Sequence, residues 1–188
     1  LIITPDQDFN GSILLTLNLD LSFILNVEPV NDKPILAETP TQKIDEDTEL
    51  SLNLFALDID EDPLTFGATL DGNGSIKVVG DEITISPDKD YNGPINVATA
   101  VSDGTDTDES EFILNVSPVN DAPVLNAIES QSIAEDTSLR LALSAIDVDG
   151  DKLTYSVKVD KNAKVDIQDN QLLVVPDADF NGEIIVTV

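Results

Sequence analysis

An internal repeat of 89 residues constrains the fold of this chain more than any other sequence feature. Pro29-Val30-Asn31-Asp32 returns as Pro118-Val119-Asn120-Asp121, 89 positions later. The alternate aspartates of the segment 58–62 return in the segment 147–151 at the same offset. Apolar positions between these landmarks align without any insertion. Self-similarity at a period of this length predicts tandem modules that share one architecture.

A third, incomplete copy of the repeat opens the chain. Asp8-Phe9-Asn10-Gly11 corresponds to Asp90-Tyr91-Asn92-Gly93. However, the span 5–29 covers 24 positions and the matching span 87–118 covers 31, so seven residues are missing around 17–21. Our hypothesis is that a loop has dropped out of the numbering there. A continuous chain in the expressed protein would refute it.

The landmarks divide the chain into three parts. We expect residues 1–31 to hold the C-terminal strands of a partial repeat, residues 32–120 a complete repeat, and residues 121–188 a partial repeat that lacks its last strand. Because the chain starts abruptly and stops inside an expected strand, we interpret it as a piece of a longer protein.

Short apolar runs separated by turn residues predict an all-β fold. Hydrophobic residues make up 41% of the chain but aromatic residues only 4%, so Val, Ile, Leu and Thr carry the core. In the complete repeat we expect strands near 35–38, 48–56, 64–70, 75–79, 82–86, 95–101 and 111–116. Seven strands in fewer than a hundred residues predict tandem immunoglobulin-like Greek-key β-sandwiches, and no helix is predicted.

The charge of the chain narrows the classes of partner. Thirty-seven acidic residues against nine basic ones leave a formal net charge of −28, which repels nucleic acids and anionic membranes. The charge could serve solubility alone, or belong to a disordered tail, although the apolar alternation argues against disorder. The chain has no Cys, so disulfides cannot stabilise its domains. A bound metal ion is the usual substitute for them. It also has no apolar run long enough for a membrane helix.

The repeated acidic residues lie at expected strand ends and not along strand faces. They form an Asn-Asp-x-Pro linker, an Asp-x-Asp-x-Asp turn, a Glu-Asp-Thr segment and a Pro-Asp-x-Asp turn. Strand counting places Asp58, Asp60 and Asp103 at one end of the complete repeat, and Glu46, Asp88 and Asp90 at the other. Two like charges about 4 Å apart repel by about 4 kcal/mol at an effective dielectric constant of 20. A hard cation such as Ca²⁺, with six to eight oxygen ligands, would relieve that repulsion, and Mg²⁺ suits such a site less well.

Each acidic cluster also has a plainer interpretation. The Asp-x-Asp-x-Asp segment can be a solvated turn, and the Asn-Asp-x-Pro linker can be an Asx-type turn stiffened by proline. The Glu-Asp-Thr segment can simply be polarity at a strand start. Recurrence of all four clusters at fixed spacing is harder to obtain from solubility and favours calcium.

The same residues resemble a known family. The set Glu46, Asp58-x-Asp60, Asp88-x-Asp90, Asp103 and Asn120-Asp121-x-Pro123 resembles the calcium motifs of cadherin repeats, in the same order. The linker and the Asp-Phe-Asn-Gly turn are more similar to the bacterial branch of cadherin-like tandem repeats, found in large secreted or surface adhesins. The resemblance covers nearly the whole chain.

The resemblance implies a set of calcium ligands at two junctions between neighbouring repeats of the chain. The first junction would use Asp6, Asp8, Asn31, Asp32, Asp58, Asp60 and Asp103. The second would use Glu46, Asp88, Asp90, Asn120, Asp121, Asp147 and Asp149.

Other site chemistries fit the sequence poorly. A helix–loop–helix calcium hand starting at Asp147 would need Gly and Glu where Lys152 and Lys158 stand. Without His or Cys, zinc sites and nucleophile triads are not available. Paired carboxylates can hydrolyse glycosides, but these are repeated at strand ends and lack aromatic platforms. We therefore expect no enzyme.

The expected function is mechanical. Calcium ions would bridge adjacent repeats and turn a flexible string into a stiff spacer of a secreted or surface-anchored bacterial adhesin. Alternatively, a repeat could itself bind a cell-surface glycan or protein in a calcium-dependent way, or belong to a secreted carbohydrate-active protein. The aromatic content speaks against sugar stacking, because there is no Trp and both Tyr91 and Tyr155 align with core or turn positions.

Overall fold

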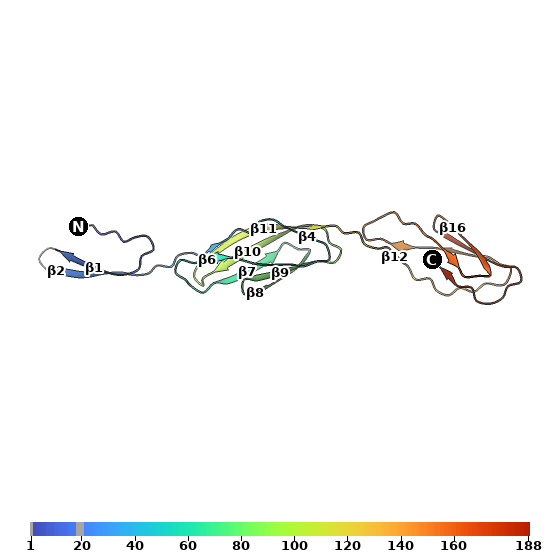
Figure 1. The fold of residues 1–188 in the computed structure, drawn as a ribbon, viewed down its shortest axis with the longest axis horizontal. Helices are drawn as coiled ribbons and strands as arrows, with labels where there is room; N and C mark the ends of the chain where they lie inside the picture. The colour runs from blue at the N-terminus through green and yellow to red at the C-terminus, as the bar shows by residue number, and fades with distance from the viewer. Residues whose placement is uncertain (1, 18–20) are drawn as a thin grey trace. The chain divides into compact units, whose positions relative to one another are not determined.

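All regular elements in the described part of the chain are β-strands (Figure 1). The computed structural model describes residues 2–17 and 21–188. The chain divides into two compact units, Leu1–Val119 and Asn120–Val188. No helix in the described residues could cross a bilayer. The prediction of an all-β fold is confirmed.

The first unit begins with a hairpin of β1 (Gly11–Leu17) and β2 (Leu21–Val27). The two strands are antiparallel, with Gly11 opposite Val27. The equivalent pair in the complete repeat is Gly93 opposite Val116, so both hairpins start in the same register. The seven-residue difference therefore lies toward the hairpin tip. The hypothesis of a dropped loop falls on residues 18–20, which lie outside the described residues.

The complete repeat, called the middle repeat from here on, contains a four-stranded sheet. Its order is β4 (Gln42–Asp45), β11 (Thr107–Ser117), β10 (Gly93–Ser102) and β7 (Thr65–Leu70). Strands β11, β10 and β7 are antiparallel neighbours, whereas β4 runs parallel to β11. Strands β10 and β11 alternate buried and exposed residues, because one face covers the core and the other meets solvent.

A second, three-stranded sheet completes the sandwich. Its order is β5 (Leu50–Asn53), β9 (Glu82–Pro87) and β8 (Gly74–Val79). A short antiparallel pair forms between β3 (Ile35–Leu36) and β6 (Ala56–Leu57). These are the layers of an immunoglobulin-like β-sandwich, as predicted.

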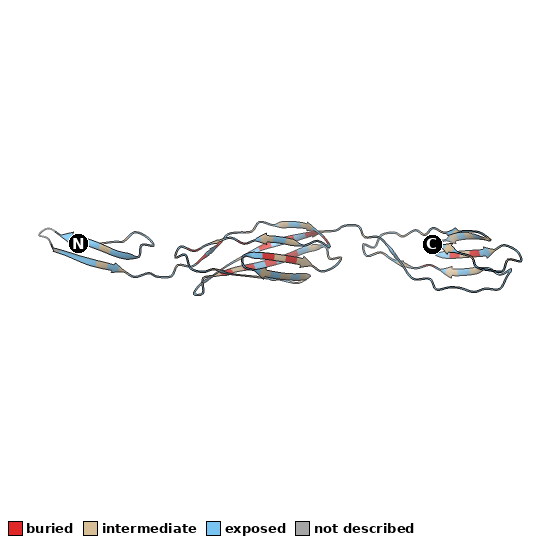
Figure 2. Ribbon diagram, turned by 60° about the horizontal axis from the view of Figure 1, so that its bottom comes forward, coloured by how far each residue is buried: buried red, intermediate tan, exposed pale blue. Residues whose placement is uncertain are grey.

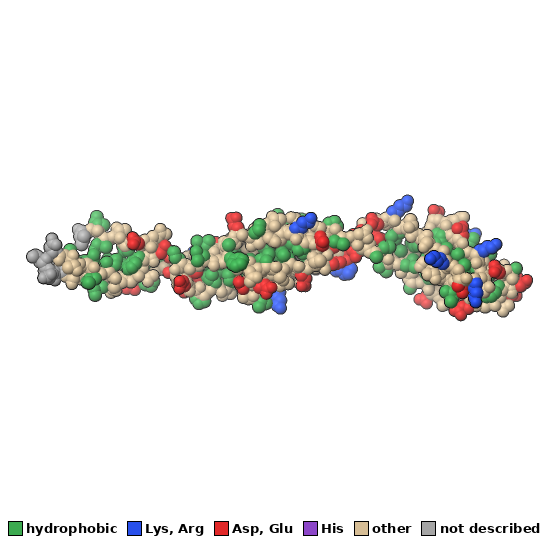
Figure 3. All heavy atoms as spheres, viewed as in Figure 1, with side chains coloured by type: hydrophobic (Ala, Val, Ile, Leu, Met, Phe, Trp, Pro, Cys, Tyr) green, Lys and Arg blue, Asp and Glu red, His purple; other side chains and the backbone are tan. Residues whose placement is uncertain are grey.

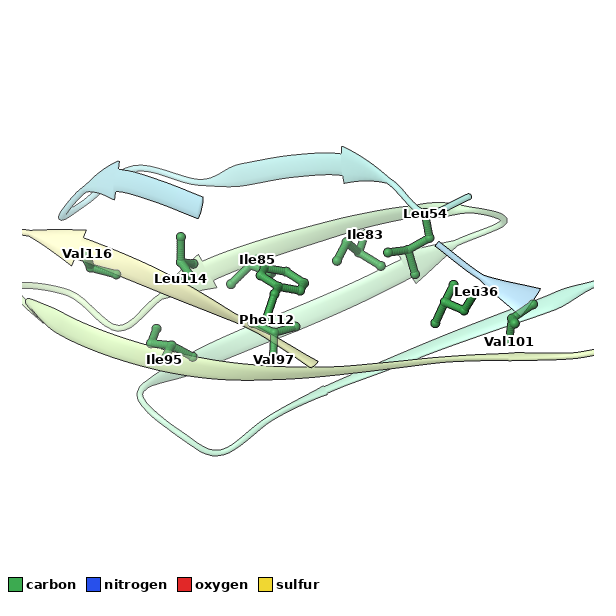
Figure 4. Close-up of a cluster of buried hydrophobic side chains, with 10 residues drawn as sticks. All are labelled: Leu36, Leu54, Ile83, Ile85, Ile95, Val97, Val101, Phe112, Leu114 and Val116. Carbon is green, nitrogen blue, oxygen red and sulfur yellow. The ribbon is translucent and has the colours of Figure 1, made fainter. Parts of the chain in front are cut away.

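The core of the middle repeat is a layer of aliphatic side chains and one aromatic ring. Figure 4 shows these side chains converging from strands of both sheets, and Figure 2 shows the buried positions concentrated in this repeat. The buried residues are Leu36, Leu54, Ile83, Ile85, Ile95, Val97, Val101, Phe112, Leu114 and Val116.

Two details of the middle repeat differ from the predicted strands. The segment 48–56 was expected as one strand, but it divides into β5 and β6. At the break, Leu54 N–H donates to Asp81 O and Ala37 N–H donates to Phe55 O, so the backbone changes partners from β9 to β3. Strand β4 was not predicted, because Ile44 is its only aliphatic residue and tertiary pairing with β11 decides its conformation.

The second unit repeats this arrangement over fewer strands. Its strands are β13 (Leu139–Ala142), β17 (Gln171–Pro176), β16 (Ala163–Gln168), β12 (Val124–Leu125), β14 (Ala145–Ile146), β15 (Lys158–Val159) and β18 (Val186–Thr187). β13, β17 and β16 form a sheet equivalent to β5, β9 and β8. Leu143, Leu172 and Val174 form its buried cluster, at the positions of Leu54, Ile83 and Ile85.

Candidate metal centre

The turn after β6 places three aspartates together at one end of the middle repeat. Leu54 and Asp58 are buried, whereas Phe55, Leu57 and Ile59 are exposed, so the strand alternation directs Asp58 inward. Carboxylate oxygens of Asp58, Asp60 and Asp62 all lie within 4.8 Å of one another. The surface of this repeat is rich in acidic side chains (Figure 3).

One carboxylate oxygen in this turn has no donor. Asp58 is only 9% exposed. Its Oδ1 accepts hydrogen bonds from Asp60 N–H (3.0 Å) and Asp62 N–H (3.2 Å). Its Oδ2 is buried without a hydrogen-bond partner among the described residues. Leaving a buried carboxylate oxygen unsatisfied is costly, and an ion is one of the standard explanations for such an atom.

The linker that precedes the repeat is attached to the same turn. Asp32 N–H donates to Asp60 Oδ2 at 2.7 Å. Partial burial, followed by the negative charges of Asp8, Asp60 and Asp58, raises the pKa of Asp32. Four carboxylates therefore repel one another around Asp32, and a cation bound there would relieve the repulsion.

Asp6 and Asp8 lie in the N-terminal turn, and only Asp8 is seen to act on this region. The Asp6 carbonyl accepts the Phe9 N–H at 3.2 Å, and Asp8 has a left-handed backbone with φ of 62°. The charge of Asp8 is one of those that act on Asp32. Asp90 and Asp179 occupy the same turn position with φ of 57° each. Asp tolerates this conformation better than most residues, so backbone geometry accounts for part of its recurrence.

Asp103 serves mainly as an internal acceptor. Its Oδ1 accepts Thr105 N–H (2.6 Å) and Asp106 N–H (2.7 Å), and its Oδ2 accepts the Asn31 amide at 3.0 Å. The Asn31 amide also donates to Asp106 Oδ2 at 3.0 Å. The hydrogen bond from Asp106 N–H, then those from Asn31 and Thr105, lower the pKa of Asp103. The loop thus holds the linker through Asn31.

Asp108, at the start of β11, forms a second attachment to the linker. Its Oδ2 accepts Leu36 N–H at 2.8 Å, and its Oδ1 pairs with Lys33 Nζ at 2.8 Å. The Lys33 hydrogen bond, then that of Leu36, lowers the pKa of Asp108.

The other end of β11 carries the second acidic group of the middle repeat. Glu46 N–H donates to Ser117 O (2.9 Å), and the buried Glu46 carboxylate accepts Val119 N–H (2.5 Å) and the Asn92 amide (3.4 Å). Asp103 precedes β11 and Ser117 ends it, so the two groups are separated by the length of this strand, about 33 Å at 3.3 Å per residue. This is the arrangement that strand counting predicts.

Asp88 and Asp90 belong to the turn at that second end. Asp88 N–H donates to Asn73 O at 3.0 Å, and Asp88 O accepts Tyr91 N–H at 3.1 Å. Asp90 N–H donates to Asp47 Oδ1 at 3.1 Å, which joins the turn to the Glu-Asp-Thr segment. The Asp90 carboxylate pairs with Lys89 Nζ at 2.7 Å. A metal role for Asp90 would therefore compete with that ion pair.

The remaining predicted ligands lie in the second unit and repeat the linker geometry. Asp121 N–H donates to Asp149 Oδ2 at 2.7 Å, as Asp32 does to Asp60. The Asn120 amide donates to Asp121 O at 2.8 Å. Asp147 Oδ1 accepts Asp151 N–H at 3.1 Å. Their meeting with Glu46, Asp88 and Asp90 in one junction stays a prediction.

Four further aspartates contact the predicted ligands or the linker, although they were not themselves predicted as ligands. They are Asp47, Asp62, Asp106 and Asp108. Asp62 recurs as Asp151 and Asp47 as Asp136, so the repeat itself was a signal for both. Asp106 and Asp108 lie in an acidic run that the first copy lacks, and only the fold brings them to the linker.

Tandem β-sandwiches with an acidic turn beside each linker define the class of protein. The family model described as the bacterial Ig domain matches residues 31–115 and 120–188. The chain belongs to the bacterial Ig domain family. Comparison with curated proteins gave no match.

Solved structures with a similar fold include cadherin ectodomains. Human protocadherin-24 EC1-2 is 22% identical, with 79% of this chain and 79% of that chain covered and a TM-score of 0.42. Drosophila N-cadherin EC1-4 is 17% identical over 88% of this chain and 47% of that one, with a TM-score of 0.47. An endo-fucoidan hydrolase from glycoside hydrolase family 107 is 14% identical over 92% of this chain, with a TM-score of 0.38. This chain spans 30% of that hydrolase chain.

Proposed function

We propose that this chain is a calcium-binding, calcium-rigidified extender region of a secreted or surface-anchored bacterial adhesin, and not an enzyme. The observation that carries the proposal is the buried, donor-free Oδ2 of Asp58 within a group of three carboxylates. Ca²⁺ prefers oxygen ligands of this kind, in larger numbers and with looser geometry than Mg²⁺. The donor set therefore fits calcium.

The residues that would hold the ion belong to two segments of the chain. Asp58, Asp60 and Asp62 come from the turn after β6, and Asp32 comes from the linker that is already hydrogen-bonded to Asp60. Bound calcium would supply positive charge that favours the docked linker over the free one. At calcium concentrations ten times the dissociation constant, one such site adds about 1.4 kcal/mol to the ordered state.

Calorimetric titration with calcium tests the proposal. The wild-type chain should bind calcium, and Asp58→Asn should bind at least one ion fewer. Glu111→Gln is the matched control, because Glu111 is an exposed acid in the middle of β11, and it should leave the stoichiometry unchanged. Absence of binding by the wild-type chain at millimolar calcium would overturn the proposal. Small-angle scattering with calcium or with chelator then tests rigidity, since an extender should become more extended with calcium.

A second candidate function, binding of a cell-surface glycan or protein, is favoured by one exposed surface. Phe55 (70% exposed), Leu57 (68%) and Ile59 (55%) point away from the core on successive outward positions. Exposed apolar groups of this kind often mark binding sites, and an aromatic ring can stack on a sugar. Phe55→Ser introduces the residue found at the equivalent position 144. A glycan array with and without calcium, probed with wild type and this variant, should separate a binding module from a plain spacer.

A further inference from the structure

The linker before the middle repeat contains a basic residue, Lys33, that pairs with a carboxylate of the repeat. Lys33 Nζ lies 2.8 Å from Asp108 Oδ1, while the other oxygen of the same carboxylate accepts Leu36 N–H at 2.8 Å. The Lys33 side chain is 54% exposed and that of Asp108 is 26% exposed. One carboxylate on β11 thus holds both ends of the segment 33–36.

The segment 33–36 is also packed deeply against the middle repeat. Pro34 is fully buried and Leu36 is 6% exposed. The residue equivalent to Lys33 is Ala122, which has no charge to offer a carboxylate.

From these contacts we propose that Asp108 is a positioning residue that keeps the linker 33–36 docked on the middle repeat in the absence of calcium, with Lys33 as its built-in counter-cation. Asp32 lies next to Lys33, and Asp32 N–H donates a hydrogen bond to Asp60 in the turn 58–62. Docking of 33–36 therefore holds Asp32 in place before any ion binds. The linker 120–123 has Ala122 at the position of Lys33 and so could not form this ion pair.

The role of this latch (Lys33, Leu36 N–H and Asp108) rests on the proposed calcium function, but its contacts do not include the ion. The two ideas therefore fail separately. If calcium does not bind, the extender proposal fails while the latch still orders the linker. If calcium binds but the linker 33–36 is open without it, only the latch proposal fails.

Hydrogen exchange of the whole chain in chelator tests the latch. In the wild type, the Leu36 amide should exchange slowly without calcium. Asp108→Ala removes both contacts, so exchange at Leu36 should be about tenfold faster or more, as expected for loss of a charge-assisted hydrogen bond. Lys33→Ala removes only an exposed ion pair and should accelerate exchange about threefold.

Two further variants distinguish the latch from general destabilisation. Lys33→Arg keeps the ion pair and should retain wild-type protection at Leu36. Lys77→Ala removes the same charge from an exposed position on β8 and should have no effect at Leu36. Core amides such as that of Ile85 should stay protected in all variants. Fast exchange at Leu36 in wild type without calcium, or equal protection in wild type and Asp108→Ala, would overturn the proposal.

Discussion

The Asp-x-Asp turns of the middle repeat (58–62) and of the second unit (147–151) have similar sequences but differ in their surroundings. Asp58 is 9% exposed and one of its oxygens is buried without a donor, whereas Asp147 at the equivalent position is half-buried. Both turns receive a linker N–H at 2.7 Å, from Asp32 and from Asp121. The linker contact thus follows from the local motif. Burial of the first aspartate depends on the packing around it, and the residues of the second unit correspond only to 31–99 of the middle repeat, without an equivalent of β11.

The largest difference should appear in the two cores. Leu54→Ala should destabilise the middle repeat by about 3 kcal/mol, because a fully packed cluster cannot collapse around the cavity. Leu143→Ala should cost the second unit about 2 kcal/mol, since fewer buried residues surround it. Denaturant unfolding combined with hydrogen exchange can assign each loss to its unit. Equal losses would show that the second core is as tightly packed as the first.

Removing the charge at the two turns should have opposite effects with and without calcium. In chelator, Asp58→Asn should stabilise the middle repeat by about 1 to 2 kcal/mol, because it removes a buried negative charge that lies beside two other carboxylates and has no donor at Oδ2. With calcium the same variant should be less stable than wild type. Asp147→Asn should change the melting temperature in chelator by a smaller amount. A destabilised Asp58→Asn in chelator would contradict this account of the buried oxygen.

The backbone of the two turns offers a third comparison. Glu61 has φ of 60°, and the equivalent Gly150 has φ of 75°. A left-handed conformation costs a non-glycine residue about 1 kcal/mol. Glu61→Gly should therefore raise the stability of the middle repeat by up to about 1 kcal/mol, and Gly150→Glu should lower that of the second unit by a similar amount. Thermal melts in chelator measure both changes, and opposite signs would refute the strain argument.

The smallest expected effect is a pH dependence of the linker 33–36. The pKa of Asp108 is lowered from 3.8 by Lys33 and Leu36, so its stabilisation is present above about pH 3.8 and is lost as pH falls through the lower folded value. The raised pKa of Asp32 acts in the opposite direction, since protonation relieves repulsion in the folded state. In chelator, protection of the Leu36 amide should decrease upon acidification below pH 3.8 in wild type but change little in Asp108→Asn. Equal pH profiles for the two proteins would exclude this role of Asp108.

Much of the fold was predictable because it depends on local sequence patterns. Alternating apolar residues predicted the strands of both sheets, and turn residues predicted their limits. The prediction missed β4, whose only aliphatic residue is Ile44, because its pairing with β11 joins residues about 70 positions apart. It also missed the break between β5 and β6, where the chain leaves one sheet for another.

The sequence by itself determined the repeat, the all-β class and the positions of the acidic turns, because these depend on periodicity and on residue type. Only the tertiary structure decided that Asp58 is buried with one oxygen that has no donor. It also decided that the Asp103 carboxylate accepts hydrogen bonds from its own loop and that Asp108 holds the linker. The physical reason is that burial and hydrogen-bond partners come from segments distant in the chain. A sequence motif names the donors and acceptors, but the packing of the two sheets selects which of them remain available.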